Sequence, residues 1–241
     1  MRSITRELAE EIFVTAYVVP VTLLLWQSPM MVTILLIAGS VGMFILWHRP
    51  EDFIAYMTAF GIGFFADYMC TKANFYTFGA ADMMKLPSWG PICWGFICVL
   101  FMRGAATMYR ILHEVPPFRN DRFRKVLLLL VQIAIVLYFW KTVTLVSRHL
   151  AATVGAVLIV SARIWNTERD LCAFLVTGLS GVVAEASAIH LGIWAYPANA
   201  YFFTEPFRLP ISIPLVYGVI GVLVYRASTL ATKWKGRTAD P

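Results

Sequence analysis

FIAYMTAFGIGFFADYMC, residues 53–70, is an apolar run with a single carboxylate, Asp67, near its end. Its length is close to the roughly 20 apolar residues that cross a lipid bilayer as a helix. An ionised side chain inside the bilayer costs about 2.5 to 3.5 kcal/mol even on the lenient insertion scale, so it usually has a partner or a function. The run therefore predicts a transmembrane helix and makes Asp67 the first candidate for a functional residue.

The composition of the whole chain has the same character. Of 241 residues, 59% are hydrophobic and 14% are charged, whereas soluble domains carry about 25% charged residues. The sequence predicts an all-α polytopic membrane bundle of about eight transmembrane helices. The apolar runs lie near residues 12–27, 29–47, 53–70, 90–109, 126–147, 150–165, 171–190 and 211–227. The first and sixth of these runs are short, so seven spans with one interfacial helix are the alternative to eight.

Basic residues in the loops predict the orientation, because Lys and Arg are enriched on the cytoplasmic side. With eight helices, most of the 20 Lys and Arg residues fall on one side; the other side holds Lys72, Lys85, Lys141, Arg148 and Arg208. We expect an integral protein of the plasma (inner) membrane with both termini in the cytoplasm. Contact with membrane lipids explains the net charge of +6 without a nucleic-acid partner.

Motifs of soluble enzymes are missing from the sequence. The four Cys residues form no CxxC pair, and the four His residues have no metal-ligand spacing. Gly61, Gly63 and Ala66 match a GxGxxA string, but this string lies inside an apolar helix rather than after a strand, so it predicts no dinucleotide site. We expect neither a metal nor a cofactor.

The segment around Asp67 occurs twice. GFFADYMC at 63–70 aligns with GVVAEASA at 181–188, and the offset of 118 residues places Asp67 on Glu185. After the next loop the offset becomes 123, and two further segments align: LPSWGPICWGFICVLFMR at 86–103 and LPISIPLVYGVIGVLVYR at 209–226. Self-similarity at fixed offsets is the sequence signature of an internal repeat.

The repeat predicts how the chain is divided. We expect a first four-helix repeat at 1–112, a cytoplasmic linker at 113–125 and a second four-helix repeat at 126–241. Four spans in each unit make the two copies parallel, related by an axis along the membrane normal. Asp67 and Glu185 would then face each other across this axis.

Two acidic groups in an aromatic, poorly hydrated cavity suit proton transfer. A protonated carboxyl group can add its proton to a carbon–carbon double bond, and aromatic faces stabilise the resulting carbocation. Water or an internal double bond can then capture the cation. We expect an integral membrane enzyme of hydratase or cyclase type acting on a lipid-soluble isoprenoid or carotenoid, with Asp67 and Glu185 as catalytic residues. Candidate substrate-binding residues are Lys72, Tyr76, Trp94, His190, Trp194, Tyr196 and Tyr217.

A local resemblance points the same way. The segment 185–217, with Glu185, Gly192, Tyr196 and Pro214, resembles the glutamate, glycine, tyrosine and later proline pattern of the carotenoid hydratase family, which includes the bacterioruberin-type hydratases. The resemblance implies an all-helical membrane enzyme that adds water to the end of a carotenoid, with Glu185 as the candidate acid. Between Glu185 and Tyr196 this chain lacks the glycine-rich spelling of that family.

Two other functions stay open. A membrane transporter or receptor for an amphiphilic small molecule would also suit parallel repeats and membrane carboxylates. A structural or assembly subunit of a membrane complex could use the linker HEVPPFRNDRFRK at 113–125 as a docking segment. The expected partners are a lipid-soluble small molecule and membrane lipids, with a homo-oligomer or a larger membrane complex as open alternatives.

Overall fold

A computed structural model describes residues 4–47, 49–116, 118–145, 167–196, 209–210 and 212–237. This part of the chain is almost entirely helical, with two short strands. The elements are α1 (Ile4–Leu25), α2 (Pro29–Trp47), α3 (Pro50–Lys72), β1 (Thr77–Phe78), α4 (Gly90–Glu114), α5 (Asp121–Leu145), α7 (Glu168–His190), β2 (Trp194–Ala195) and α8 (Ile213–Arg237). The predicted all-helical class is confirmed.

Six of these helices, α1, α2, α3, α4, α7 and α8, are long and apolar enough to cross a membrane. They support the prediction of a membrane protein. Helix α1 begins at Ile4, well before the predicted start near residue 12, so the first helix is not short. Pro20 lies inside this helix. Helix α5 covers most of the fifth predicted run. The sixth run, 150–165, lies outside the described residues, so the number of eight spans stays a prediction.

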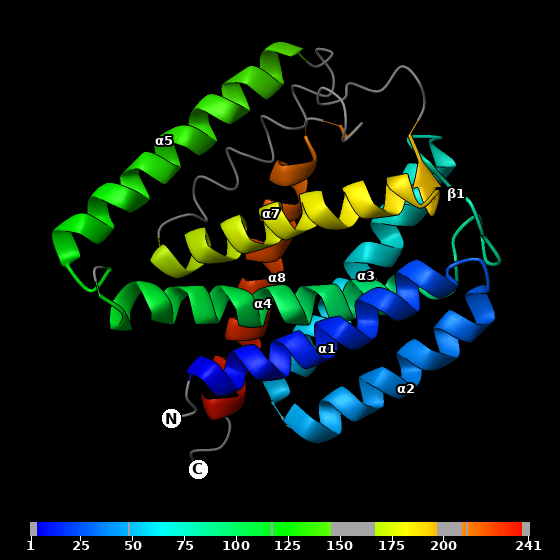
Figure 1. Ribbon diagram of the computed structural model, residues 1–241, viewed down its shortest axis with the longest axis horizontal. Coiled ribbons are helices and arrows are strands. Elements are labelled where there is room, and N and C mark those ends of the chain that lie inside the picture. Colours follow the sequence, from blue (N-terminus) through cyan, green and yellow to red (C-terminus); the bar gives the residue numbers. More distant parts are fainter. Residues whose placement is uncertain are drawn as a thin grey trace.

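The helices pack around a group of four. Helix α3 packs on α4, α7 packs on α8, and these two pairs meet where α4 contacts α7 and α3 contacts α8. Figure 1 shows α4 and α7 alongside each other, with α3 and α8 crossing them and α5 slanting away. Helix α1 covers α4, and α2 covers α1.

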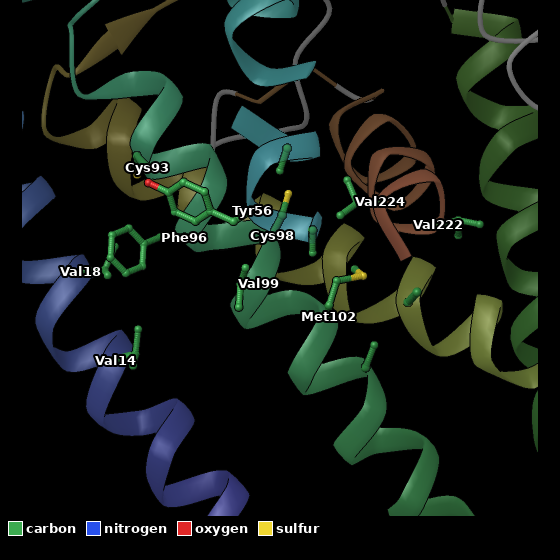
Figure 2. Close-up of a cluster of buried hydrophobic side chains, with 14 of the residues drawn as sticks. Val14, Val18, Tyr56, Cys93, Phe96, Cys98, Val99, Met102, Val222 and Val224 are labelled. Carbon is green, nitrogen blue, oxygen red and sulfur yellow. The ribbon is translucent and has the colours of Figure 1, made fainter. Parts of the chain in front are cut away.

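Apolar side chains lie both inside and outside this bundle. Figure 2 shows Val14 and Val18 of α1 pointing toward the side of α4 that carries Phe96, and Tyr56 of α3 meets the same ring edge-on at 5.9 Å. On the outer face of α1, Leu24 is 76% exposed. A helix that is hydrophobic on all sides is typical of a membrane span, because lipid can cover the outer face.

Ion pairs join neighbouring helices at one end of the bundle, and both carboxylates are buried. Asp52, in the first turn of α3, accepts a hydrogen bond from Arg103 of α4. Asp170, in the first turn of α7, accepts from Arg226 of α8 at 2.7 and 3.1 Å. An acidic residue in a first helical turn also interacts favourably with the positive end of the helix dipole. The offsets of 118 and 123 align these two pairs with each other.

The connection between α4 and α5 is shorter than predicted. Helix α4 continues through Glu114 and α5 begins at Asp121, so helix occupies both ends of the predicted linker. His113 and Arg124, from the two sides of the connection, contact the Glu168 carboxylate of α7 at 2.9 and 3.3 Å. These contacts attach the connection to the start of α7.

Candidate functional site

Asp67 and Glu185 line one cavity of about 50 Å³, which we call the carboxylate cavity. Asp67 lies in the last part of α3 and Glu185 in the last part of α7, and both are at least nine-tenths buried. The cavity lies between these two helices and the starts of α4 and α8. Two acidic side chains that are 118 positions apart in the sequence therefore meet at one place.

Aromatic donors hold Asp67. Its two oxygens accept hydrogen bonds from the Tyr76 hydroxyl and from the Trp94 indole Nε1, the latter at 2.8 Å. Trp94 comes three residues after Pro91, which lies in the first turn of α4, where a proline is well tolerated. Helix α4 thus starts at a proline, and this start positions Trp94 toward Asp67.

Glu185 has the same kind of surroundings. Its oxygens accept from Trp194 Nε1 at 2.8 Å, from the Tyr217 hydroxyl at 3.0 Å and from the Tyr196 hydroxyl at 3.2 Å. Tyr217 comes three residues after Pro214 in the first turn of α8. Within the described part of the chain, every hydrogen-bond donor to the two carboxylates is a phenol or an indole, and none is a cation.

The donors of the two carboxylates also contact each other. The rings of Trp94 and Tyr217 are stacked with centroids 5.3 Å apart. Tyr76 and Tyr196 meet edge-on at 5.5 Å. The site is therefore one continuous aromatic cluster rather than two separate ones.

A two-stranded sheet brings the connections after α3 and α7 together over the site. Strands β1 and β2 pair antiparallel, with Thr77 opposite Ala195 and Phe78 opposite Trp194. The Gly79 N–H extends the ladder by donating to the Ile193 carbonyl at 2.8 Å. The pairing explains how tyrosines from two distant connections reach the carboxylates, and it was not predicted from the sequence.

Two glycines allow the aromatic donors to approach the carboxylate helices. A Cβ atom on Gly63 of α3 would lie 2.2 Å from Cγ of Trp94, and one on Gly181 of α7 would lie 2.3 Å from Cγ of Tyr217. Such distances do not occur between real side chains. The aligned glycines of GFFADYMC and GVVAEASA are thus required by the rings that pack against them.

The loop tyrosines stay protonated. Burial, and then the neighbouring Asp67 carboxylate, raise the pKa of Tyr76 far above the usual range of a phenol. Burial and the Glu185 carboxylate do the same to the pKa of Tyr196. Both hydroxyls therefore act as neutral hydrogen-bond donors over the whole physiological pH range.

The structure separates the predicted binding residues into two groups. Tyr76, Trp94, Trp194, Tyr196 and Tyr217 all donate to a carboxylate, as described above. Lys72 and His190 are exposed at the ends of α3 and α7 and are not among these donors. The Lys72 ammonium instead lies over the Tyr68 ring, 5.7 Å from its centroid. Five residues along a helix is about 140° around it, which directs both side chains away from the carboxylate that precedes them.

Six residues of the carboxylate cavity were not among the predicted site residues: Phe78, Trp89, Gly90, Cys93, Ile97 and Ala184. Phe78 meets both Tyr76 and Trp194 edge-on, at 5.6 and 5.7 Å. Trp89 precedes α4 and is 3% exposed. Phe78 lies in a two-residue strand, which has no periodicity to detect. Trp89, Cys93 and Ile97 are spaced four residues apart and share one helical face, and this spacing could have indicated them.

Within the described residues there is no group of three or more His, Cys, Asp or Glu side chains that could hold a metal ion. No protein-family model, curated protein or solved structure matches the chain. The local resemblance to carotenoid hydratases therefore stays a prediction, and the function has to be argued from the site.

Proposed function

We propose that this chain is an integral membrane enzyme that carries out acid–base chemistry, of hydratase or cyclase type, on a lipid-soluble isoprenoid or carotenoid. One observation carries the proposal: Asp67 and Glu185 share a cavity, and among the described residues their hydrogen-bond donors are all neutral aromatic side chains. The same chain shows what a structural carboxylate looks like, since Asp52 and Asp170 are each bonded to an arginine. A buried carboxyl group without a cation can exchange a proton with a ligand.

The reaction that suits this pair conserves atoms and needs no oxidant. One carboxyl group gives its proton to a carbon–carbon double bond, and the aromatic rings around the cavity stabilise the carbocation. In hydration, water adds to the cation and its proton passes to a carboxylate of the pair. In cyclisation, an internal double bond attacks the cation instead, and loss of a neighbouring proton to the carboxylate restores a double bond.

We also propose that the chain is two parallel four-helix repeats, with eight spans in total. The support comes from contacts that recur at aligned positions. Tyr76 and Trp194 each donate to the carboxylate nine residues earlier, and Trp94 and Tyr217 each donate from the first turns of α4 and α8. The ion pairs and close-packed glycines recur in the same way.

The test replaces each acid by its neutral amide, Asp67→Asn and Glu185→Gln, in the full-length chain. Pigments and prenyl lipids extracted from cells that express each variant are compared by chromatography with those from wild type. We expect each variant to lower product formation by about 100-fold or more, the usual contribution of a general acid or base. Glu51→Gln, at an exposed carboxylate of α3, is the matched control. Unchanged products in both amide variants would exclude the acid–base role.

A transporter for an amphiphilic molecule is the second candidate, and one observation favours it. A polar cavity of about 680 Å³ lies at the other end of α3 and is lined by Arg49, Asp52, Arg103 and Arg169 among others. Cavities near both ends of one helix group suit passage between them. This function predicts that vesicles containing the protein accumulate an amphiphile. It also predicts no chemical conversion, so the lipid extracts of the wild type would contain no product.

A further inference from the structure

The carboxylate cavity is too small for the substrate of the proposed reaction. Its volume of about 50 Å³ has room for one or two water molecules, since a water molecule occupies about 30 Å³ in the liquid. Pockets for organic ligands usually have about 300 to 1,000 Å³. Most of a hydrocarbon substrate must therefore lie outside this cavity, with only its reacting end between Asp67 and Glu185.

A larger cavity adjoins it. This cavity has about 440 Å³ and lies between one face each of α1, α4 and α7. It shares Trp89, Cys93, Ile97, Ala184 and Trp194 with the carboxylate cavity. Most of its walls are valine, leucine, isoleucine and aromatic side chains, so we call it the apolar groove.

The apolar groove extends along α4. On α4 it runs from Trp89 past Ile97 and Phe101 to Gly104, positions that share one helical face. The 15 residues between the first and last of these correspond to a rise of about 22 Å, against a hydrocarbon core of about 30 Å. An extended hydrocarbon chain lying along α4 has this shape.

Trp89 gives an independent sign of a ligand where the two cavities join. It is 3% exposed, and its indole Nε1 has no hydrogen-bond partner among the described residues. Buried N–H groups in proteins nearly always have an acceptor. An oxygen atom on a molecule bound in the apolar groove would supply one beside the carboxylate pair.

We infer that the apolar groove binds a linear isoprenoid chain. The reacting end of this chain, which carries an oxygen atom or receives one from water, lies at Trp89 and enters the carboxylate cavity. The inference rests on the proposed function only for the reaction at that end. Binding of the isoprenoid is a separate property, because it depends on the walls of the groove and on the Trp89 N–H rather than on the acids.

The experiment measures binding without turnover. Radiolabelled phytol, a linear isoprenoid alcohol, and phytene, the same chain without the hydroxyl, are bound to the full-length protein in nanodiscs. Ser180→Trp places a ring in the apolar groove from α7, and Leu179→Trp places the same ring on the adjacent exposed position. We expect Ser180→Trp to lower the affinity for both probes at least ten-fold and Leu179→Trp to leave it unchanged.

Trp89→Phe tests the hydrogen bond, because it keeps a ring and removes the N–H. We expect it to lower phytol affinity about three- to ten-fold, as for one net hydrogen bond, and to leave phytene affinity unchanged. Equal binding by Ser180→Trp and Leu179→Trp would overturn the groove, and equal weakening of both probes by Trp89→Phe would overturn the hydrogen bond. If Ser180→Trp does not fold, Thr15→Trp fills the groove from α1, with the exposed Ala16→Trp as control.

The outcomes separate the two proposals. Blocked binding in Ser180→Trp, together with unchanged products in Asp67→Asn and Glu185→Gln, would support the groove and exclude the acid–base function. Lost product in the acid variants, together with unaffected binding in Ser180→Trp, would support the function and overturn the groove.

Discussion

Trp94 and Tyr217 each combine two properties in one side chain. The polar edge of each ring donates to a carboxylate, while the ring faces stack on each other at 5.3 Å. A side chain of this kind fixes the position of an acid and, through its ring, also holds the two halves of the site together. A serine or an asparagine could supply only the hydrogen bond. The aromatic donors are therefore part of the support for the proposed carbocation chemistry.

The first prediction concerns one of these donors. Tyr217→Phe removes a hydroxyl from Glu185 and leaves a buried carboxyl oxygen with one partner fewer, at a cost of about 1 to 3 kcal/mol in the free energy of unfolding. Tyr17→Phe removes a hydroxyl that donates to the Leu35 carbonyl at 2.6 Å, and we expect a loss of about 1 kcal/mol or less. Thermal unfolding in detergent micelles measures both. An equal or larger loss in Tyr17→Phe would contradict the prediction.

At the scale of the helix, the approach of α4 to α3 and of α8 to α7 depends on glycine. Gly63→Ala and Gly181→Ala would each force an aromatic ring out of place, because a Cβ atom would lie within 2.3 Å of it. We expect each change to lower the free energy of unfolding by about 1 to 3 kcal/mol, as overpacking does, and to displace the donor from its carboxylate. Denaturant unfolding in mixed micelles measures the loss.

The control for this prediction lies two residues away on the same helix. A Cβ atom on Gly61 would meet nothing within 4 Å. Alanine is favoured over glycine in a helix by about 1 kcal/mol, so Gly61→Ala should be neutral or stabilising. A loss of stability in Gly61→Ala as large as in Gly63→Ala would show that helix position rather than ring packing decides the result.

The two ion pairs differ in how far they are buried. Arg103→Met leaves Asp52 buried without its arginine, and we expect a loss of about 3 kcal/mol or more. Arg226→Met should cost less, because the Arg226 side chain is 39% exposed and Asp170 keeps the Thr167 hydroxyl at 2.6 Å. Thermal unfolding in micelles compares the two variants. A larger loss in Arg226→Met would contradict the order.

For the whole molecule, the predicted orientation can be tested by labelling. In a Cys70→Ala background, Ala73→Cys lies exposed in the turn after α3 and Asn120→Cys lies exposed between α4 and α5. We expect a membrane-impermeant maleimide added to intact cells to label Ala73→Cys and to reach Asn120→Cys only after permeabilisation. Labelling of Asn120→Cys in intact cells would reverse the orientation.

Much of the fold and part of the site could be predicted from the sequence. Hydrophobic runs indicate the six described helices that are long and apolar enough to cross a membrane. The aligned Asp67 and Glu185 indicate the candidate site, because an acid inside an apolar helix is costly. The donors Trp94 and Tyr217 follow from the same alignment. Lys72 and His190 are close to the two acids along the chain, but the rotation of the helix directs their side chains away from the carboxylates. Strands of two residues and the unpartnered Trp89 N–H depend on tertiary contacts that no local pattern records.

The register of β1 and β2 has a consequence for how such a chain could diversify. Thr77 pairs with Ala195, and these are the two positions that the offset of 118 aligns, so the strands meet in the isologous manner of a homodimer. Two identical units could close the same site, but each would then carry the same acid and the same donors. Joined in one chain, the halves vary independently, and an aspartate can face a glutamate and a tryptophan a tyrosine. In the proposed two-repeat arrangement, joining the halves would allow the two acids to take different parts in the proposed reaction.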